Sequence, residues 1–194
     1  MRSRIRSIAG AFSESKVALK PQTYATIVSI IMAVLAPQIA HVLGRAFGVE
    51  KAIGEIILPM HFPVILVGVL AGPYAGLITG LMGPLASSLL TGMPAMVKLP
   101  FMMIELGAYG LVAGLVRNTK LNMVLKVLIA QIVGRVIRAL AIIIAVSGFG
   151  NPNLEIAAII PGYVKGIIGI ILELALIPLI MWGINKAADE KSFV

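Results

Sequence analysis

Apolar segments separated by short polar stretches follow one another along almost the whole chain. Most of them are about as long as a helix that crosses the bilayer hydrocarbon, which takes about 20 apolar residues. The pattern therefore predicts an all-α, polytopic membrane protein that folds as a bundle of six transmembrane helices. We expect these helices at about 23–44, 58–72, 74–91, 99–116, 121–147 and 155–184.

The two ends of the chain are more polar than the rest. Residues 1–22 carry several arginines and lysines and are predicted to be a basic cytoplasmic N-terminal segment. Residues 23–184 form the predicted membrane domain, and 185–194 a cytoplasmic tail. The first apolar run is too long for the core of a signal peptide, and further runs follow it, so we expect it to be a retained helix.

Glycine and proline interrupt the apolar stretch at 58–94. Glycines recur at every fourth position, at Gly68, Gly72, Gly76 and Gly80. Small residues let helix backbones approach closely, so this spacing predicts tightly packed helices. The pair Gly72-Pro73 predicts a tight turn between the second and the third helix.

Composition and charge exclude several classes of protein. The chain is 59% hydrophobic and 12% charged, whereas soluble domains carry about 25% charged residues. Its net charge of +8 would suggest a nucleic-acid partner in a soluble protein. Here lysine and arginine gather at helix ends, where they set topology, so we expect no nucleic acid. No cysteine is present, which excludes disulfides, thiolate metal sites and cysteine nucleophiles.

The cations are unevenly divided between the predicted loops. One side carries the basic N-terminal segment, Arg117, Lys120, Lys186 and Lys191. The other side carries Arg45, Lys51 and Lys98, offset by Glu50, Glu55 and Glu155. By the positive-inside rule both termini are predicted to be cytoplasmic, in a multi-pass protein of the cell membrane.

Ionisable residues fall inside the predicted helices, at Glu105, Arg135, Arg138, Lys165 and Glu173. A charge in hydrocarbon costs about 2.5–3.5 kcal/mol on insertion scales, so such side chains face the bundle interior, pair, or contact a substrate. Helix geometry places Gln131, Arg135 and Arg138 on one face, and the charges in the outer half and the middle of the membrane.

This placement predicts a binding pocket that opens to the outside. Three cations against two carboxylates favour a substrate that carries a carboxylate or phosphate. The alternative is an ion-pair cluster that only fixes helix register.

A histidine and two tyrosines could also line this pocket. His61 begins the second helix and is either a pocket wall or a histidine at the membrane boundary. Tyr109 lies one turn after Glu105 and Tyr163 just before Lys165. Each tyrosine either contacts a ligand or is an interfacial tyrosine. The candidate substrate-binding residues are therefore Glu105, Tyr109, Arg135, Arg138, Lys165 and His61. The histidines and scattered glutamates lack metal-ligand spacing, so we predict no metal site.

Small residues form a stripe along the first helix. They are Ala25, Ser29, Ala33, Ala36 and Ala40, and they fall within about 80° of one another at about 100° per residue. Such a smooth face suits close helix contact. It either packs inside the molecule or docks on a partner protein.

Common catalytic motifs are missing from the sequence. It contains no G-x-x-x-x-G-K-[ST], G-x-S-x-G or H-E-x-x-H. We therefore predict that the chain is not an enzyme, needs no cofactor and does not bind ATP through a phosphate loop.

Three segments resemble the substrate-binding S components of energy-coupling factor (ECF) vitamin transporters, a group with pantothenate, folate and cobalamin-type members. They are LPMHFPVILVGVLAGPYAGLITGLMGPLASSLLTGMP at 58–94, ELGAYGLVAGL at 105–115 and GIIGIILELALIPLI at 166–180. The resemblance implies a six-helix bundle with an outer pocket lined by helices four to six and capped by loops at about 45–57, 92–98 and 148–155.

The resemblance also implies partners. They are a membrane T component, docked on an Ala-x-x-x-Ala face of the first helix, and two ATPase subunits that bind the ATP. Ala36 and Ala40 match that face in letters. The leading hypothesis is a high-affinity binding subunit for uptake of a vitamin, with pantothenate or another acid-bearing vitamin as the first candidate. The alternatives are a self-sufficient proton-coupled carrier, working through Glu105 or Glu173, and a membrane subunit without a small-molecule ligand.

Overall fold

A computed structural model of the chain describes residues 17–46, 48, 56–148 and 156–189. These residues form helices and connections, with no strand among them. The α-helices are α2 (Leu19–Ala46), α4 (His61–Ala71), α5 (Pro73–Thr91), α6 (Leu99–Leu115), α7 (Met123–Ser147), α8 (Ile159–Lys165) and α9 (Ile167–Asp189), and the 3-10 helix η1 (Ile156–Ala158) precedes α8. The prediction of an all-α fold is confirmed.

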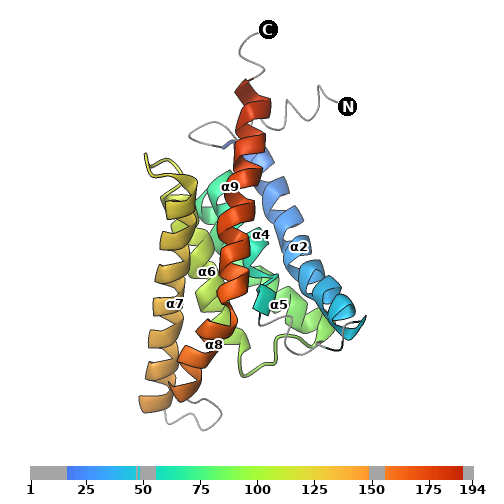
Figure 1. The fold of residues 1–194 in the computed structure, drawn as a ribbon, viewed down its shortest axis with the longest axis vertical. Helices are drawn as coiled ribbons and strands as arrows, with labels where there is room; N and C mark the ends of the chain where they lie inside the picture. The colour runs from blue at the N-terminus through green and yellow to red at the C-terminus, as the bar shows by residue number, and fades with distance from the viewer. Residues whose placement is uncertain (1–16, 47, 49–55, 149–155, 190–194) are drawn as a thin grey trace.

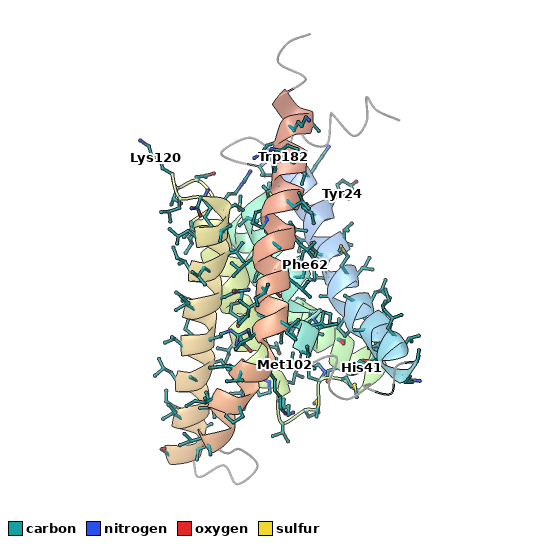
Figure 2. The ribbon with its side chains drawn as sticks, in the orientation of Figure 1. Tyr24, His41, Phe62, Met102, Lys120 and Trp182 are labelled. Carbon is teal, nitrogen blue, oxygen red and sulfur yellow. The ribbon has the colours of Figure 1, made fainter. Side chains whose placement is uncertain are left out.

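The helices stand side by side in an elongated bundle (Figure 1). Helix α6 packs against α4, α5 and α7, while α2 covers α4 and α5, and α9 lies against α7 and α4. The start of α2, the start of α7 and the end of α9 lie at the same end of the bundle, the top in Figure 1. Figure 2 places Lys120 near this end, and His41 and Met102 toward the opposite one.

Not all the predicted spans have the length that a bilayer requires. Helices α2, α5, α7 and α9 are long and apolar enough to cross a membrane. Helix α4 has 11 residues and α6 has 17. At 1.5 Å per residue α4 extends only about 16 Å, roughly half the hydrocarbon thickness. Among the described helices, length and composition thus support four of the six predicted spans.

Close backbone contact explains the glycine spacing. A Cβ added to Gly76 would lie 2.2 Å from the carbonyl oxygen of Gly110, and one added to Gly80 would lie 2.2 Å from that of Leu106. Any side chain at these positions would push α5 away from α6. Gly72, with φ of 107°, makes the turn between α4 and α5, and Pro73 opens α5. The predicted packing and turn are confirmed.

The predicted continuous helix over 155–184 is wrong, because the chain breaks at Gly166 between α8 and α9 (Figure 1). Glycine has low helix propensity, and the segment leading into α4 packs against this point. A Cβ on Gly166 would lie 2.9 Å from a methyl group of Leu58, and one on Gly169 would lie 2.7 Å from the carbonyl oxygen of Ile57. The break therefore depends on a contact that is distant in sequence.

Two helices extend beyond their predicted bounds, and most of the predicted outer loops lie outside the described residues. Helix α2 begins at Leu19 and α9 continues to Asp189, so both extend beyond the predicted membrane domain at 23–184. Helix α7 begins where the Asn122 side chain accepts a hydrogen bond from Leu125 N at 2.8 Å, a typical N-cap. Most of the predicted outer loops at 45–57 and 148–155, and most of the terminal segments, fall outside the described residues.

Candidate functional site

Glu105 is the centre of a buried polar cluster between α6 and α7. It is 1% exposed. Its Oε1 accepts a hydrogen bond from the Tyr109 hydroxyl at 2.7 Å, and its Oε2 forms an ion pair with Arg138 Nη1 at 2.9 Å. Both carboxylate oxygens are therefore occupied by donors from the protein. The predicted alternative of an internal ion pair holds for this part of the cluster.

Tyr109 joins three helices. Its ring is fully buried and lies against Gly134 of α7, where an added Cβ would be only 2.3 Å from the Tyr109 ring. The ring of His61, at the start of α4, lies 5.3 Å from it between centroids. Tyr109 is thus a core residue and not an interfacial tyrosine, and it brings buried His61 to the edge of the cluster.

Arg135 faces the short helix α8. Its guanidinium carbon lies 5.0 Å from the centre of the Tyr163 ring, within the range of a cation–π contact. The Tyr163 hydroxyl donates a hydrogen bond to the backbone oxygen of Arg135 at 2.7 Å. The same ring lies 6.0 Å from the guanidinium carbon of Arg138. Tyr163 is therefore a member of the site that the candidate list did not include.

Gln131 and Glu173 form a second buried pair between α7 and α9. Gln131 Nε2 donates a hydrogen bond to Glu173 Oε2, and both side chains are almost completely buried. The sequence placed Gln131 on the face of Arg135 and marked Glu173 as a buried charge. Their pairing was not predictable, since it requires knowing that α7 and α9 are neighbours.

These contacts define what we call the polar site. Its members are His61, Glu105, Tyr109, Gln131, Arg135, Arg138, Tyr163 and Glu173. Several of their buried polar atoms have no hydrogen-bond partner in the described part of the chain. They are His61 Nδ1, Gln131 Oε1, Arg135 Nε, Arg138 Nε and Glu173 Oε1. Leaving a buried polar atom unpaired costs about 1–3 kcal/mol, so this concentration of such atoms suits a polar ligand.

Lys165 differs from these groups in its exposure. It ends α8, and its side chain is exposed. Without it, two arginines face two glutamates in the polar site. The excess of one cation in the sequence count came from Lys165, and the buried groups by themselves are balanced in formal charge.

The comparisons with known proteins identify the family. A family model described as the ECF transporter substrate-specific component matches residues 23–181 of the chain. The chain belongs to this family. The match includes every residue of the polar site. No curated protein and no solved structure matches the chain in the other two comparisons.

The S component is accordingly a transmembrane, substrate-specific subunit of a transporter. The family is one of transporter binding subunits and not of enzymes. Four helices in the described part of the chain are long and apolar enough to cross a bilayer, which agrees with a membrane protein. Among the described residues of the S component, no group of three or more His, Asp or Glu side chains has the geometry to hold a metal ion.

The small-residue stripe on α2 of the S component packs mainly inside the bundle. Ser29, Ala33 and Ala40 are buried. A Cβ on Gly83 of α5 would lie 2.9 Å from the Cβ of Ala33, so the two helices are in close contact there. These three residues therefore pack inside the molecule. Ala25 and Ala36 are only partly buried.

Proposed function

We propose that this S component is a high-affinity binding subunit for the uptake of a vitamin or a vitamin-like small molecule. The observation that carries the proposal is the polar site. It gathers unpartnered, buried hydrogen-bonding atoms from three helices of a transporter binding subunit. Soluble and membrane proteins alike avoid such atoms unless water or a ligand satisfies them.

We further propose that the polar site lies in the outer half to the middle of the membrane and that the termini are cytoplasmic. Glu105 lies in the first half of α6 and Arg138 in the second half of α7, away from the end where α2 starts and α9 ends. That end carries Lys20, Arg117, Lys120 and Lys186, as the positive-inside rule requires of a cytoplasmic side. In this arrangement α4 and α6 complete six membrane segments of a cell-membrane protein.

A T component and two ATPases are the proposed partners, and the ATPases bind the ATP. The T component would dock on α2 through Ala36, a member of the small-residue stripe that keeps exposed surface. Ala25 is also partly exposed, but it packs against Val67, Ala71 and Ala75. ATP hydrolysis would drive reorientation of the bundle and release of the ligand inside. For this coupling the ligand must bind one conformation better than the other.

Pantothenate or another acid-bearing vitamin is the first substrate to test. Arg135 supports this choice, because its guanidinium lies over the Tyr163 ring and has no carboxylate partner among the described residues. Arginine recognises carboxylates through charge-assisted hydrogen bonds.

Reconstituted uptake tests the proposal. Proteoliposomes with the S component, the T component and both ATPases should accumulate radiolabelled pantothenate, or the compound that copurifies with the S component, only when ATP is enclosed. Liposomes with the S component alone should accumulate none. Uptake by the S component alone under an inward proton gradient would overturn the proposal.

That outcome would favour a proton-coupled carrier as the second candidate function. Glu173 is the observation behind it, because this carboxyl is 2% exposed and only the amide of Gln131 hydrogen-bonds to it in the described structure. Carboxyl groups inside membrane helices are the usual members of proton relays in transporters.

A further inference from the structure

The unpartnered atoms of the polar site fall into two sets of opposite hydrogen-bonding character. The first set consists of two acceptors, Gln131 Oε1 and Glu173 Oε1. Gln131 uses its amide nitrogen on Glu173 Oε2, and this bond holds the two side chains together across α7 and α9. The remaining oxygens of the pair therefore present acceptors.

The second set consists of guanidinium donors, of which Arg135 is the less satisfied. Arg138 donates a hydrogen bond from Nη1 to Glu105. Arg135 contacts the Tyr163 ring, and its Nε is buried without a partner among the residues that the structure covers. Arg135 lies one helical turn beyond Gln131 on the same face of α7, so the two backbone positions are about 6 Å apart along the helix axis.

Neither a simple anion nor a simple cation satisfies both sets. An anion on Arg135 would leave the oxygens of Gln131 and Glu173 without a donor. A cation or neutral amine on those oxygens would leave the Arg135 guanidinium without an acceptor. A buried donor or acceptor that stays unpaired weakens binding, because the group has lost water and gained nothing.

We propose that the polar site binds an amphoteric small molecule. An amine, amide or ring N–H group of this molecule donates to Gln131 Oε1 and Glu173 Oε1. A carboxylate or carbonyl oxygen at the other end of the molecule accepts from Arg135, which lies one helical turn farther along α7. This inference rests on the proposed function and narrows its substrate class.

The compound bound in cells gives the first test. The full-length S component is purified from the membranes of producing cells and denatured, and the released small molecule is identified by mass spectrometry. A compound with both an N–H donor and an oxygen acceptor supports the inference. A compound that lacks either group overturns the inference and leaves the binding function standing. If no compound is released and none of the probes described next binds, the proposed function fails and the inference fails with it.

Three matched probes test the two ends of the site separately. They are 4-aminobenzoate, with an amine and a carboxylate at opposite ends of one ring, benzoate, which lacks the amine, and aniline, which lacks the carboxylate. Binding to the S component in lipid nanodiscs is measured by calorimetry. We expect 4-aminobenzoate to bind about tenfold or more tightly than either partial probe, the effect of one charge-assisted hydrogen bond. If benzoate binds as tightly as 4-aminobenzoate, the proposed role of Gln131 and Glu173 as acceptors for the ligand is overturned.

Variants assign each end to its residues. Glu173→Gln should lower the affinity for 4-aminobenzoate about tenfold and leave the affinity for benzoate unchanged. Arg135→Gln should lower the affinity for both acids and leave the affinity for aniline unchanged. A merely structural role would weaken all three probes alike, and that result would overturn the assignment. Arg135→Lys, which keeps the charge, should restore part of the binding of the acids.

Thr79→Val is the matched control. The Thr79 hydroxyl is also buried without a partner among the described residues, but it lies on α5, outside the polar site. This nearly isosteric change should leave the affinity for all three probes unaltered.

Discussion

At the scale of single residues, Glu105 organises the polar site. Its carboxylate accepts hydrogen bonds from the Tyr109 hydroxyl on the same helix and from the Arg138 guanidinium on α7. One side chain therefore fixes the positions of both residues. A buried ion pair is costly to form but more costly to break by removing one partner. The pair therefore holds α6 and α7 in register beside the less satisfied groups that we assign to the ligand.

A double-mutant cycle measures this pair. Glu105→Gln and Arg138→Gln each leave a charge opposite a neutral amide and should each lower the free energy of unfolding by about 1–3 kcal/mol. The double variant should lose less than the sum of the two, by at least about 0.5 kcal/mol. Equilibrium unfolding in detergent micelles provides the values. Glu105→Gln combined with Lys186→Gln, near the far end of α9, is the control and should be additive.

Removing one hydroxyl tests the hydrogen bond inside α6. Tyr109→Phe leaves Oε1 of Glu105 without its donor and should lower the free energy of unfolding by about 1–2 kcal/mol. Tyr24→Phe, at an exposed position of α2, should change it by less than about 0.5 kcal/mol. Equal effects of the two changes in the same micelles would contradict the assigned role of the Tyr109 hydroxyl.

At the scale of elements, the contact of α5 with α6 is the tightest described feature of the bundle. Gly76 and Gly110 lie with backbone against backbone, and a Cβ on Gly110 would be 2.1 Å from the carbonyl oxygen of Gly76. Such an interface gains from packing and not from the hydrophobic effect, since lipid is as apolar as the helices.

Adding one methyl group at this contact should separate the helices. Gly76→Ala is expected to destabilise the protein by about 1–3 kcal/mol or more, because backbone atoms cannot move aside as side chains do. Gly183→Ala on α9 is the matched control, with nothing within 4 Å of the new Cβ. It should be neutral or slightly stabilising, since alanine favours helix by up to about 1 kcal/mol. Thermal unfolding of the two variants distinguishes them, and equal transition temperatures would contradict the argument.

The stripe on α2 gives a second test at this scale. Ala33→Leu should destabilise the isolated S component, because Ala33 is fully buried against Gly83. Ala36→Leu should leave its unfolding temperature nearly unchanged and reduce copurification with the T component. If Ala36→Leu left the complex intact, docking through this position would be excluded.

The sequence predicts the features that neighbouring residues determine, and it misses those that depend on contacts between distant segments. Gly72-Pro73 marks its own turn, and the spacing of Gln131, Arg135 and Arg138 defines a helix face without any neighbour. The break at Gly166 and the pairing of Gln131 with Glu173 depend on contacts between distant segments. Lys165 was expected among the buried charges because the helix was taken to continue through it. The break leaves it exposed at the end of α8.

At the scale of the whole molecule, the end of the bundle with Lys20, Lys120 and Lys186 carries more of the described cations than the opposite end, and the polar site lies away from it. Lys126 Nζ donates to the backbone oxygen of Arg117 at 2.6 Å, which ties the first turn of α7 to the connection between α6 and α7 at the end that carries Lys120. The polar site lies farther toward the end where α7 finishes and α8 begins. A binding subunit for uptake requires this polarity, with the ligand entering from outside and the cationic end in the cytoplasm.

Absence of cysteine makes this orientation directly measurable. Single cysteines are introduced at Lys120, on the α6–α7 connection, and at Met96, on the exposed segment between α5 and α6. A membrane-impermeant maleimide added to intact cells should label Met96→Cys, and should label Lys120→Cys only after the membrane is opened. The cysteine-free parent supplies the background. Labelling of Lys120→Cys in intact cells would show that the topology is the reverse of the proposed one. The polar site would then open toward the cytoplasm, which suits export and not uptake.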